Sequence, residues 1–194
     1  LVIDATYIFL GDRPEPILKS IERFPLSSGE SGWQAVHQIA ALLPLARQKK
    51  VPVIYSVGDP SLPKEWIKKR SNSGRVNAGK GGNEVVAEIA PVAGDLVIRK
   101  VAPSIFFSTP LVSVLNPLGI DTLLFCGGVT SGCVRASVVD AASYGYKAAV
   151  IEEGTFDRGE VSHKVNLFDL NAKYANVMSA AEVRDYLNGL GVKS

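Results

Sequence analysis

The sequence predicts a three-layer, doubly wound α/β fold with a mainly parallel sheet of about six strands. Two patterns predict it. Short apolar runs rich in β-branched residues recur along the chain, and amphipathic helical patterns lie between them. Strands that alternate with helices are typical of a parallel sheet covered by helices on both faces. The length suits one such unit, so we expect 1–194 to form a single domain.

The expected strands are runs that are apolar throughout, which indicates burial on both faces of the sheet. In order they are 1–3, 51–56, 95–98, 122–125 and 147–151, with a short sixth at 174–177. The expected helices are segments in which apolar residues recur at helical spacing. They are 32–50, 110–118, 134–145 and 181–190.

Two segments interrupt this alternation. Residues 12–31 contain several prolines, and residues 58–82 are rich in Lys, Arg, Ser, Asn and Gly. Loops of this length in a compact domain are usually functional lids or interface arms. We therefore expect two long loops that either cover a site or join subunits.

The composition points to no large charged partner. The chain has 46% hydrophobic and 21% charged residues and a formal charge of +2, which gives no reason to expect binding to nucleic acid or to a membrane. The basic run at 64–70 is expected to be a solvated helix face. No apolar run approaches the roughly 20 residues of a membrane span. The chain begins on an expected core strand, without a signal peptide or an initiator Met, so we expect native residues ahead of Leu1.

The two cysteines, Cys126 and Cys133, lie seven residues apart. That spacing fits neither a zinc knuckle nor a CxxC redox pair. A reducing, cytoplasmic setting is therefore expected.

Cys133 stands where a Gly/Ser/Thr loop gives way to an expected helix, just after a buried strand. A thiol at a helix N-terminus meets free backbone N–H groups and the positive end of the helix dipole. Both favour the thiolate, which is the nucleophilic form of cysteine. The alternative is a packed, inert cysteine.

Polar residues follow the carboxyl ends of three expected strands: Asp4, Lys100 and Cys133. In open α/β sheets ligands bind at this edge, so the three side chains are expected to converge. Lys100 would then lower the thiol pKa, and Asp4 would take the thiol proton and deliver it to a leaving amine. Backbone N–H groups of the loop would stabilise an oxyanion. This chemistry is amide or ureido hydrolysis through a thioester, although Asp4 as a turn cap and Lys100 as an exposed lysine are the structural alternatives.

Three motifs carry a family resemblance: Ile3-Asp4, the segment 97–111 around Lys100, and Gly128–Val134 around Cys133. In these motifs the chain resembles the isochorismatase-like cysteine hydrolases, over nearly its whole length. Within that family, segment 130–136 is most similar to N-carbamoylsarcosine amidase and its relatives. The resemblance implies a Rossmann-like topology and a catalytic triad of Asp4, Lys100 and Cys133.

The resemblance also implies how the loop before Cys133 works. It implies a cis peptide bond at Gly128–Val129 and an oxyanion hole formed by the N–H groups of Val129 and Cys133. A further family feature is an arginine that holds a substrate carboxylate, and the matching residue is Arg158. An ion pair of Arg158 with Asp157 or Glu153 is the structural alternative.

Several neighbours of these residues are also assigned to substrate binding. They are Thr130, Phe9 and Phe106, with Phe156 as a further pocket wall. For the three phenylalanines, packing in the core is the alternative interpretation.

No metal and no cofactor are expected. Nicotinamidase-type members of the family carry an Asp/His/His metal site, whereas this chain has only His37, in an expected helix, and His163, in an expected loop after Arg158. Where a metal-binding histidine motif would follow the second strand, residues 56–60 read Ser-Val-Gly-Asp-Pro.

The sequence therefore predicts a cysteine amidohydrolase that releases ammonia from a small N-carbamoyl or amide substrate, most simply an N-carbamoyl amino acid. Its expected partner is this small molecule alone, and the resemblance implies a homodimer or homotetramer. Maleamate-, biuret- and ureidoacrylate-type amides are alternative substrates. Two alternatives belong to other functional classes. One is an anion- or nucleotide-binding module built on the loop 127–132, although no GxGxxG or GxxxxGK[ST] motif is present. The other is a redox sensor built on Cys133.

Overall fold

A computed structural model describes residues 1–59, 61 and 82–191, which fold around a six-stranded sheet with the order β3-β2-β1-β4-β5-β6. Every pair of neighbouring strands in it is parallel. The strands are β1 (Val2–Ile3), β2 (Ile54–Gly58), β3 (Leu96–Lys100), β4 (Thr122–Gly128), β5 (Lys147–Phe156) and β6 (Asn176–Met178). The strand order reverses between β1 and β4, where doubly wound folds bind their ligands. The predicted fold class is confirmed.

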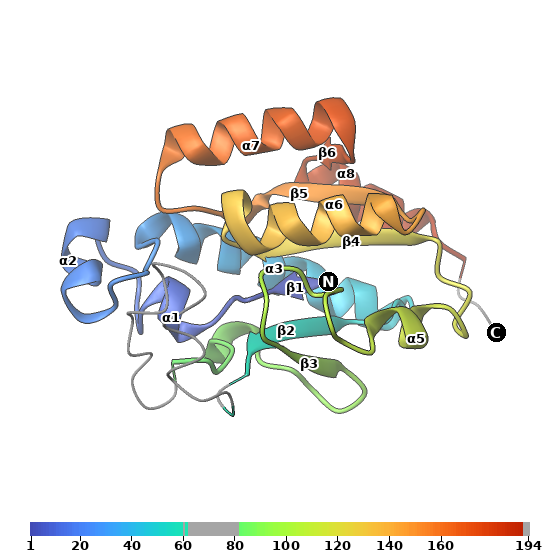
Figure 1. Cartoon of the computed structure of the whole chain (residues 1–194), viewed down its shortest axis with the longest axis horizontal. Helices are drawn as coiled ribbons and strands as arrows, with labels where there is room; N and C mark the ends of the chain where they lie inside the picture. Colours follow the sequence, from blue (N-terminus) through green and yellow to red (C-terminus); the bar gives the residue numbers. More distant parts are fainter. Residues whose placement is uncertain (60, 62–81, 192–194) are drawn as a thin grey trace.

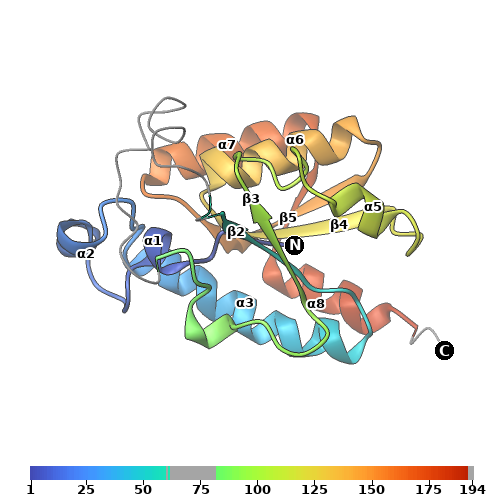
Figure 2. The ribbon, with the colours of Figure 1, turned by 60° about the horizontal axis from the view of Figure 1, so that its bottom comes forward.

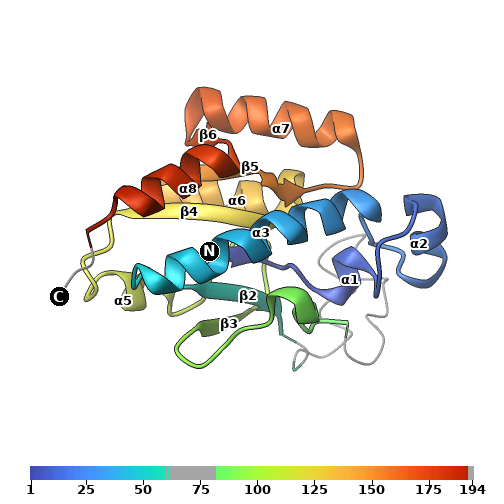
Figure 3. The ribbon, with the colours of Figure 1, turned by 180° about the vertical axis from the view of Figure 1, so that it is seen from behind.

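Helices cover both faces of the sheet (Figure 2). One face carries α3 (Glu30–Gln48) and α8 (Ala180–Gly189), which lie in front in Figure 3. The other carries α5 (Leu111–Leu115), α6 (Arg135–Ser143) and α7 (Glu160–Lys173). Two short helices, α1 (Tyr7–Leu10) and α2 (Ile17–Arg23), follow β1 at one end of the molecule (Figure 1), and a 3₁₀ turn at Ala87–Ile89 packs on α3.

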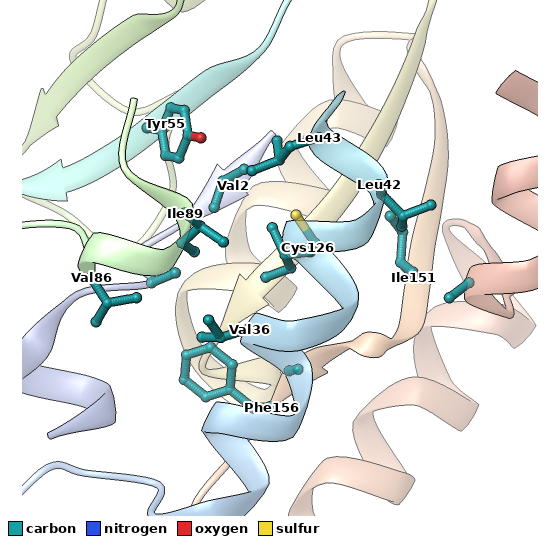
Figure 4. Close-up of a cluster of buried hydrophobic side chains, with 14 of the residues drawn as sticks. Val2, Val36, Leu42, Leu43, Tyr55, Val86, Ile89, Cys126, Ile151 and Phe156 are labelled. Atoms are coloured by element: carbon teal, nitrogen blue, oxygen red, sulfur yellow. The ribbon is translucent and has the colours of Figure 1, made fainter. Parts of the chain in front are cut away.

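Two hydrophobic cores hold these layers together. Figure 4 shows the core between the sheet and α3, where Val36 and Leu43 face the strand residues Val2 and Cys126. The second core lies under α5, α6 and α7 and contains Phe125, which is fully buried. Because helices bury both faces, β1, β2 and β4 are buried along almost their whole length, as the sequence indicated. The edge strand β3 departs from this expectation, since Leu96 is 37% and Val97 42% exposed.

Strand ends differ from the expected ones where they matter for the site. Lys100 is the last residue of β3 rather than the residue after it. β5 continues to Phe156, five residues past the expected end at Ile151, and the pairing register shifts between Phe125 and Gly127 of β4. This extension brings the end of β5 alongside the loop that leads to Cys133.

Two helices of seven residues or more were not predicted, and neither was the four-residue α1. The segment 12–31, expected to be a loop, contains α2, and Arg23 of α2 pairs with Asp12 at 2.7 Å and also with Glu15. A helix of one or two turns is marginal on its own and gives a weak signal in the sequence. The second missed helix is α7, which the sequence analysis took for a loop. Its apolar residues lie on two opposite faces, so that no single stripe stands out.

The second expected loop, 58–82, lies almost entirely outside the described residues, as does the basic run at 64–70. Among the helices that the structure describes, none has the length and hydrophobicity to cross a membrane.

Candidate active site

Two buried charged side chains form the centre of the site. Lys100 Nζ lies 2.6 Å from Asp4 Oδ2, and each side chain is 5% exposed. Ser56, on β2 between their strands, donates a hydrogen bond from Oγ to Asp4 Oδ1 at 2.7 Å. The Asp4 N–H donates to the Ser56 carbonyl at 3.2 Å. Both carboxylate oxygens therefore have a partner, which fixes the direction in which Asp4 points.

Ser56 is a site residue that the sequence analysis missed. It is the last residue of the predicted strand 51–56, and in the structure it is the third residue of β2, two residues before the end of that strand. The search for polar residues beyond strand ends, which selected Asp4, therefore did not reach Ser56. Asp4 itself has a φ of +44°, in the left-handed region that Asp adopts more readily than most residues. The chain thus turns sharply at the end of β1, at the residue that carries the carboxylate.

Cys133 completes the group. It lies in the π-helical turn Thr130–Val134, which runs directly into α6, and it is half-buried. The helical segment thus begins at Thr130, three residues before the cysteine with which it was expected to open. The Cys133 thiol lies close enough to Asp4 and Lys100 for both side chains to shift its pKa. The structure therefore brings together the three side chains that the sequence analysis selected.

The charge state of the sulfur differs from the expectation. Burial, together with the Asp4 carboxylate, raises the pKa of the Cys133 thiol to about 12, although Lys100 acts in the opposite direction. Burial alone would lower the pKa of Lys100, but the facing Asp4 and Cys133 raise it, so Lys100 stays charged. The direction of this shift is opposite to the expected one, because burial of the thiol and the nearby Asp4 carboxylate outweigh the Lys100 charge.

This pKa predicts an unusual alkylation profile for Cys133. Iodoacetamide reacts with the thiolate, so below the pKa its rate rises about tenfold per pH unit. In a Cys126→Ala background, alkylation of Cys133 is expected to keep accelerating from pH 7 through pH 10, as measured by mass spectrometry. A plateau between pH 6 and pH 8 would show a stabilised thiolate and contradict the assignment.

The loop between β4 and Cys133 is anchored to the end of β5. The Gly128–Val129 peptide bond is cis, and Val129 is buried. The Ser131 N–H donates to Asp157 Oδ2 at 2.7 Å. Thr130 is fully buried, and its hydroxyl donates to the Phe156 carbonyl at 3.0 Å. These bonds fix the turn that carries Cys133.

His163 is a further anchor that the sequence analysis did not assign. It lies on α7, and its Nδ1 is 2.8 Å from Thr130 Oγ1. Because Thr130 has one hydroxyl proton and gives it to the Phe156 carbonyl, the imidazole must donate at Nδ1. Burial lowers the pKa of His163, which favours the neutral ring with its proton on Nδ1. The spacing of Thr130 and His163, on separate elements, left no signal in the sequence.

Two substitutions separate this anchoring role from simple packing. His163→Asn places an amide N–H near the position of Nδ1, whereas His163→Gln places it near that of Nε2. We expect the Gln variant to lose about tenfold in kcat, the equivalent of one hydrogen bond, and the Asn variant to stay within about threefold of the wild type. Steady-state kinetics with melting curves measure both. Equal losses in the two variants would argue against the Nδ1 bond.

With this geometry in view, the chain can be compared with known proteins. The isochorismatase domain matches residues 24–182. The chain belongs to the isochorismatase family. It is 34% identical over 161 residues to a maleamate amidohydrolase from Pseudomonas putida, covering 80% of this chain and 76% of the relative. It is 31% identical over 159 residues to an N-carbamoylsarcosine amidase from an Arthrobacter species, covering 75% and 58% respectively.

A solved structure shares the fold. A cysteine hydrolase from Pseudomonas syringae pv. phaseolicola superposes with a TM-score of 0.81 at 23% identity, over 98% of this chain and 92% of the other. The family resemblance seen in the motifs is confirmed. The predicted enzyme class, a hydrolase of C–N bonds other than peptide bonds, is confirmed through the named amidohydrolases.

Arg158, the arginine matched to the family's carboxylate-binding position, is exposed just beyond β5. It lines a cavity of about 750 Å³ at the N-terminal ends of α3 and α7, which the triad residues do not line. The carboxylates offered as alternative partners are otherwise engaged. Asp157 accepts the N–H groups of Ser131 and Arg158, and Glu153 accepts that of Ala180. Among the described residues the Arg158 guanidinium forms no ion pair.

The aromatic residues assigned to the pocket mostly pack inside the protein. Phe106 is 4% exposed and stacks on Tyr144 with ring centroids 5.5 Å apart. Phe156 is buried against Gly128. Phe9 is half-buried beside the core under α3. Core packing, the alternative left open for these side chains, describes Phe106. Phe156 packs in the core and also lines the cavity beside Arg158, and substrate contacts for Phe156 and Phe9 stay predictions.

The two histidines lie on separate helices, with His37 on α3 and His163 on α7, so the loop expected around His163 is helical. In the part of the chain that the structure describes, no group of three or more His, Cys, Asp or Glu side chains is arranged to hold a metal ion.

Proposed function

We propose that the protein is a cysteine-dependent amidohydrolase that releases ammonia from a small N-carbamoyl or amide substrate. The observation that carries the proposal is the buried Asp4–Lys100 ion pair, 2.6 Å long, beside the Cys133 thiol, whose pKa both partners shift. A nucleophile, a proton acceptor and a fixed positive charge are the groups that acyl transfer needs.

The acylation step begins with the neutral thiol. As the Cys133 sulfur attacks the carbonyl carbon, its proton passes to Asp4, and the C=O bond opens to an oxyanion. Lys100 stays an ammonium and offsets the negative charge gathered on the sulfur and the carboxylate. The N–H groups of Val129 and Cys133 are assigned to the oxyanion. Collapse of this intermediate breaks the C–N bond, and Asp4 returns the proton to the nitrogen that leaves as ammonia.

Deacylation reverses these roles. A water molecule adds to the thioester carbon while Asp4 accepts one of its protons. The C–S bond then breaks, and the proton returns to the Cys133 sulfur. The enzyme is restored with Asp4 and Lys100 paired, and the product carries the added oxygen. A substrate with an N-carbamoyl group yields a carbamate by this route.

A carboxylate-bearing substrate is favoured because Arg158 is exposed with an unpaired guanidinium among the described residues. Relatives are named for maleamate and for N-carbamoylsarcosine, so acids of both kinds are candidates. Ureidoacrylate, for which a further relative is named, is also an acid, whereas amides of the biuret type, which lack a carboxylate, are the alternative. Two unpaired cysteines, Cys126 and Cys133, support a reducing cytoplasm as the place of the reaction.

An ammonia-release screen over ureido acids and amides tests the proposal, with each acid accompanied by its methyl ester. We expect turnover on at least one compound and a preference for the free acid. The variant Arg158→Ala should lose about 10- to 100-fold in kcat/KM on the acid and little on the ester. Turnover that ignores the carboxylate would remove the role of Arg158, and an absence of ammonia from every compound would contradict the function.

A further inference from the structure

Helix α7 exposes apolar side chains on the face opposite the core. Val161 is 78% exposed, Val165 53% and Phe168 74%, and Ala172 is exposed as well. The buried side chains of the helix are Asn166, Leu167 and Leu170. At about 100° per residue, the centre of the exposed set lies on the opposite side of the helix from that of the buried set. The outer face of α7 is thus as apolar as a helix face that packs against a protein core, although α7 lies at the edge of the molecule (Figures 1 and 3).

The spacing of this exposed set is regular. Residues 161, 165, 168 and 172 follow one another at intervals of four, three and four, which is the repeat of the apolar seam in a coiled coil. Single exposed apolar residues are ordinary on a protein surface, but an aligned stripe of this kind marks an interaction site. We call these four residues the α7 stripe. Its spacing fits another helix as the partner.

The charged residues beside the stripe favour a second copy of α7 as the partner helix. Lys164 borders the stripe on one side and Asp169 on the other, five positions further along. When two copies of one helix pack in parallel, the residue before one seam position faces the residue five positions later on the second copy. Lys164 would then face Asp169 of the second copy, and Asp169 would face its Lys164. Both side chains already lie at the helix surface, in pairs with Glu160 and Lys173 respectively.

We propose that a second copy of this chain packs on the α7 stripe, with the two α7 helices parallel about a twofold axis. In this arrangement each residue of the stripe meets its own counterpart, as a closed, isologous dimer requires. The interface adjoins the site, because His163, which anchors the nucleophile turn, is on the same helix. It is distinct from the two loop arms suggested by the sequence.

The substitution Phe168→Lys tests the interface. The side chain is exposed in the single chain, so the fold should be unchanged by circular dichroism, whereas the dimer would bury a lysine at its centre. We expect the mass of the wild type in solution to be at least that of a dimer at about 10 µM, and the variant to dissociate about 100-fold more readily. Leu18→Lys, at a 76% exposed position on α2, is the matched control and should keep the wild-type mass.

A monomeric wild type, or a Phe168→Lys variant with the wild-type mass, would overturn the proposal. The former result would leave the stripe to another protein or to a segment of this chain.

Cysteine cross-linking tests the parallel register. Val161→Cys and Ala172→Cys lie at opposite ends of the stripe, so in a parallel pair each variant should form a disulfide with its own copy. In an antiparallel pair neither would cross-link alone, but a mixture of the two would. Non-reducing gels read both outcomes, and the unmodified chain controls for Cys126 and Cys133. Cross-linking in the mixture alone would overturn the parallel arrangement.

Discussion

Replacing Cys133 with alanine is expected to abolish ammonia release on every substrate and to leave a folded protein. Without the sulfur no thioester forms, and Asp4 and Lys100 can only assist a water molecule. Loss of a nucleophile that acts as a unit with its base costs on the order of 10⁴-fold or more in kcat. Cys133 is half-buried and the change removes one atom, so the free energy of unfolding should move by about 1 kcal/mol or less.

The matched control is Cys126→Ala. Cys126 lies on β4 in the core under α3, where its sulfur is 3.4 Å from the Leu1 carbonyl. Removing it should cost about 1 kcal/mol of stability and no turnover. Ammonia release and thermal melting, measured on both variants with purified protein, separate the two roles. Wild-type turnover in Cys133→Ala would end the cysteine mechanism, whatever the substrate.

The triad was predictable because parallel strands present their carboxyl ends at one edge of the sheet. Asp4, Lys100 and Cys133 are far apart in the sequence, but each stands at or beyond the end of an apolar run. The pairing of β1 with both β2 and β4 places these ends side by side. The rule that ligand sites lie beyond the carboxyl ends of parallel strands thus predicted a group of residues that are not close in the sequence.

The charge state of Cys133 was not predictable in the same way. The sequence places a lysine near the thiol, but the pKa depends on what else the lysine faces. In the structure Lys100 lies 2.6 Å from Asp4, and burial penalises a further charge. The sign of the shift is set by these buried contacts, which involve three segments at once. Burial and the Asp4 carboxylate therefore favour a neutral thiol beside a preformed ion pair.

Helix α7 was missed for a related reason. Pattern recognition looks for one apolar stripe, whereas α7 has one toward the core and another toward solvent. Taken together, the inner and outer apolar residues of α7 show no single helical period in the sequence. If the outer stripe is an interface between copies, both sets are packed in the assembly, and the pattern is that of a helix buried on two sides.

Replacing Gly127 with alanine is expected to prevent folding. Gly127 has a φ of +99°, and it pairs with Ile3 of β1. A Cβ built on it would lie 2.0 Å from the Ile3 carbonyl oxygen and 2.7 Å from the Ile3 nitrogen. These are backbone atoms of a strand held on both sides by β2 and β4, so no side chain can move away. We expect a loss of more than about 4 kcal/mol in the free energy of unfolding.

Gly94→Ala is the control that isolates the contact. Gly94 also has a φ of +99°, but no atom lies within 4 Å of the position of its Cβ. It therefore carries the same backbone strain without the clash, and we expect a cost of about 1–2 kcal/mol. Urea unfolding of the two variants measures the difference, and a Gly127→Ala protein as stable as Gly94→Ala would contradict the argument. Since Asp4 directly follows Ile3, the close approach of the backbone at Gly127 also brings Asp4 toward the turn that carries Cys133.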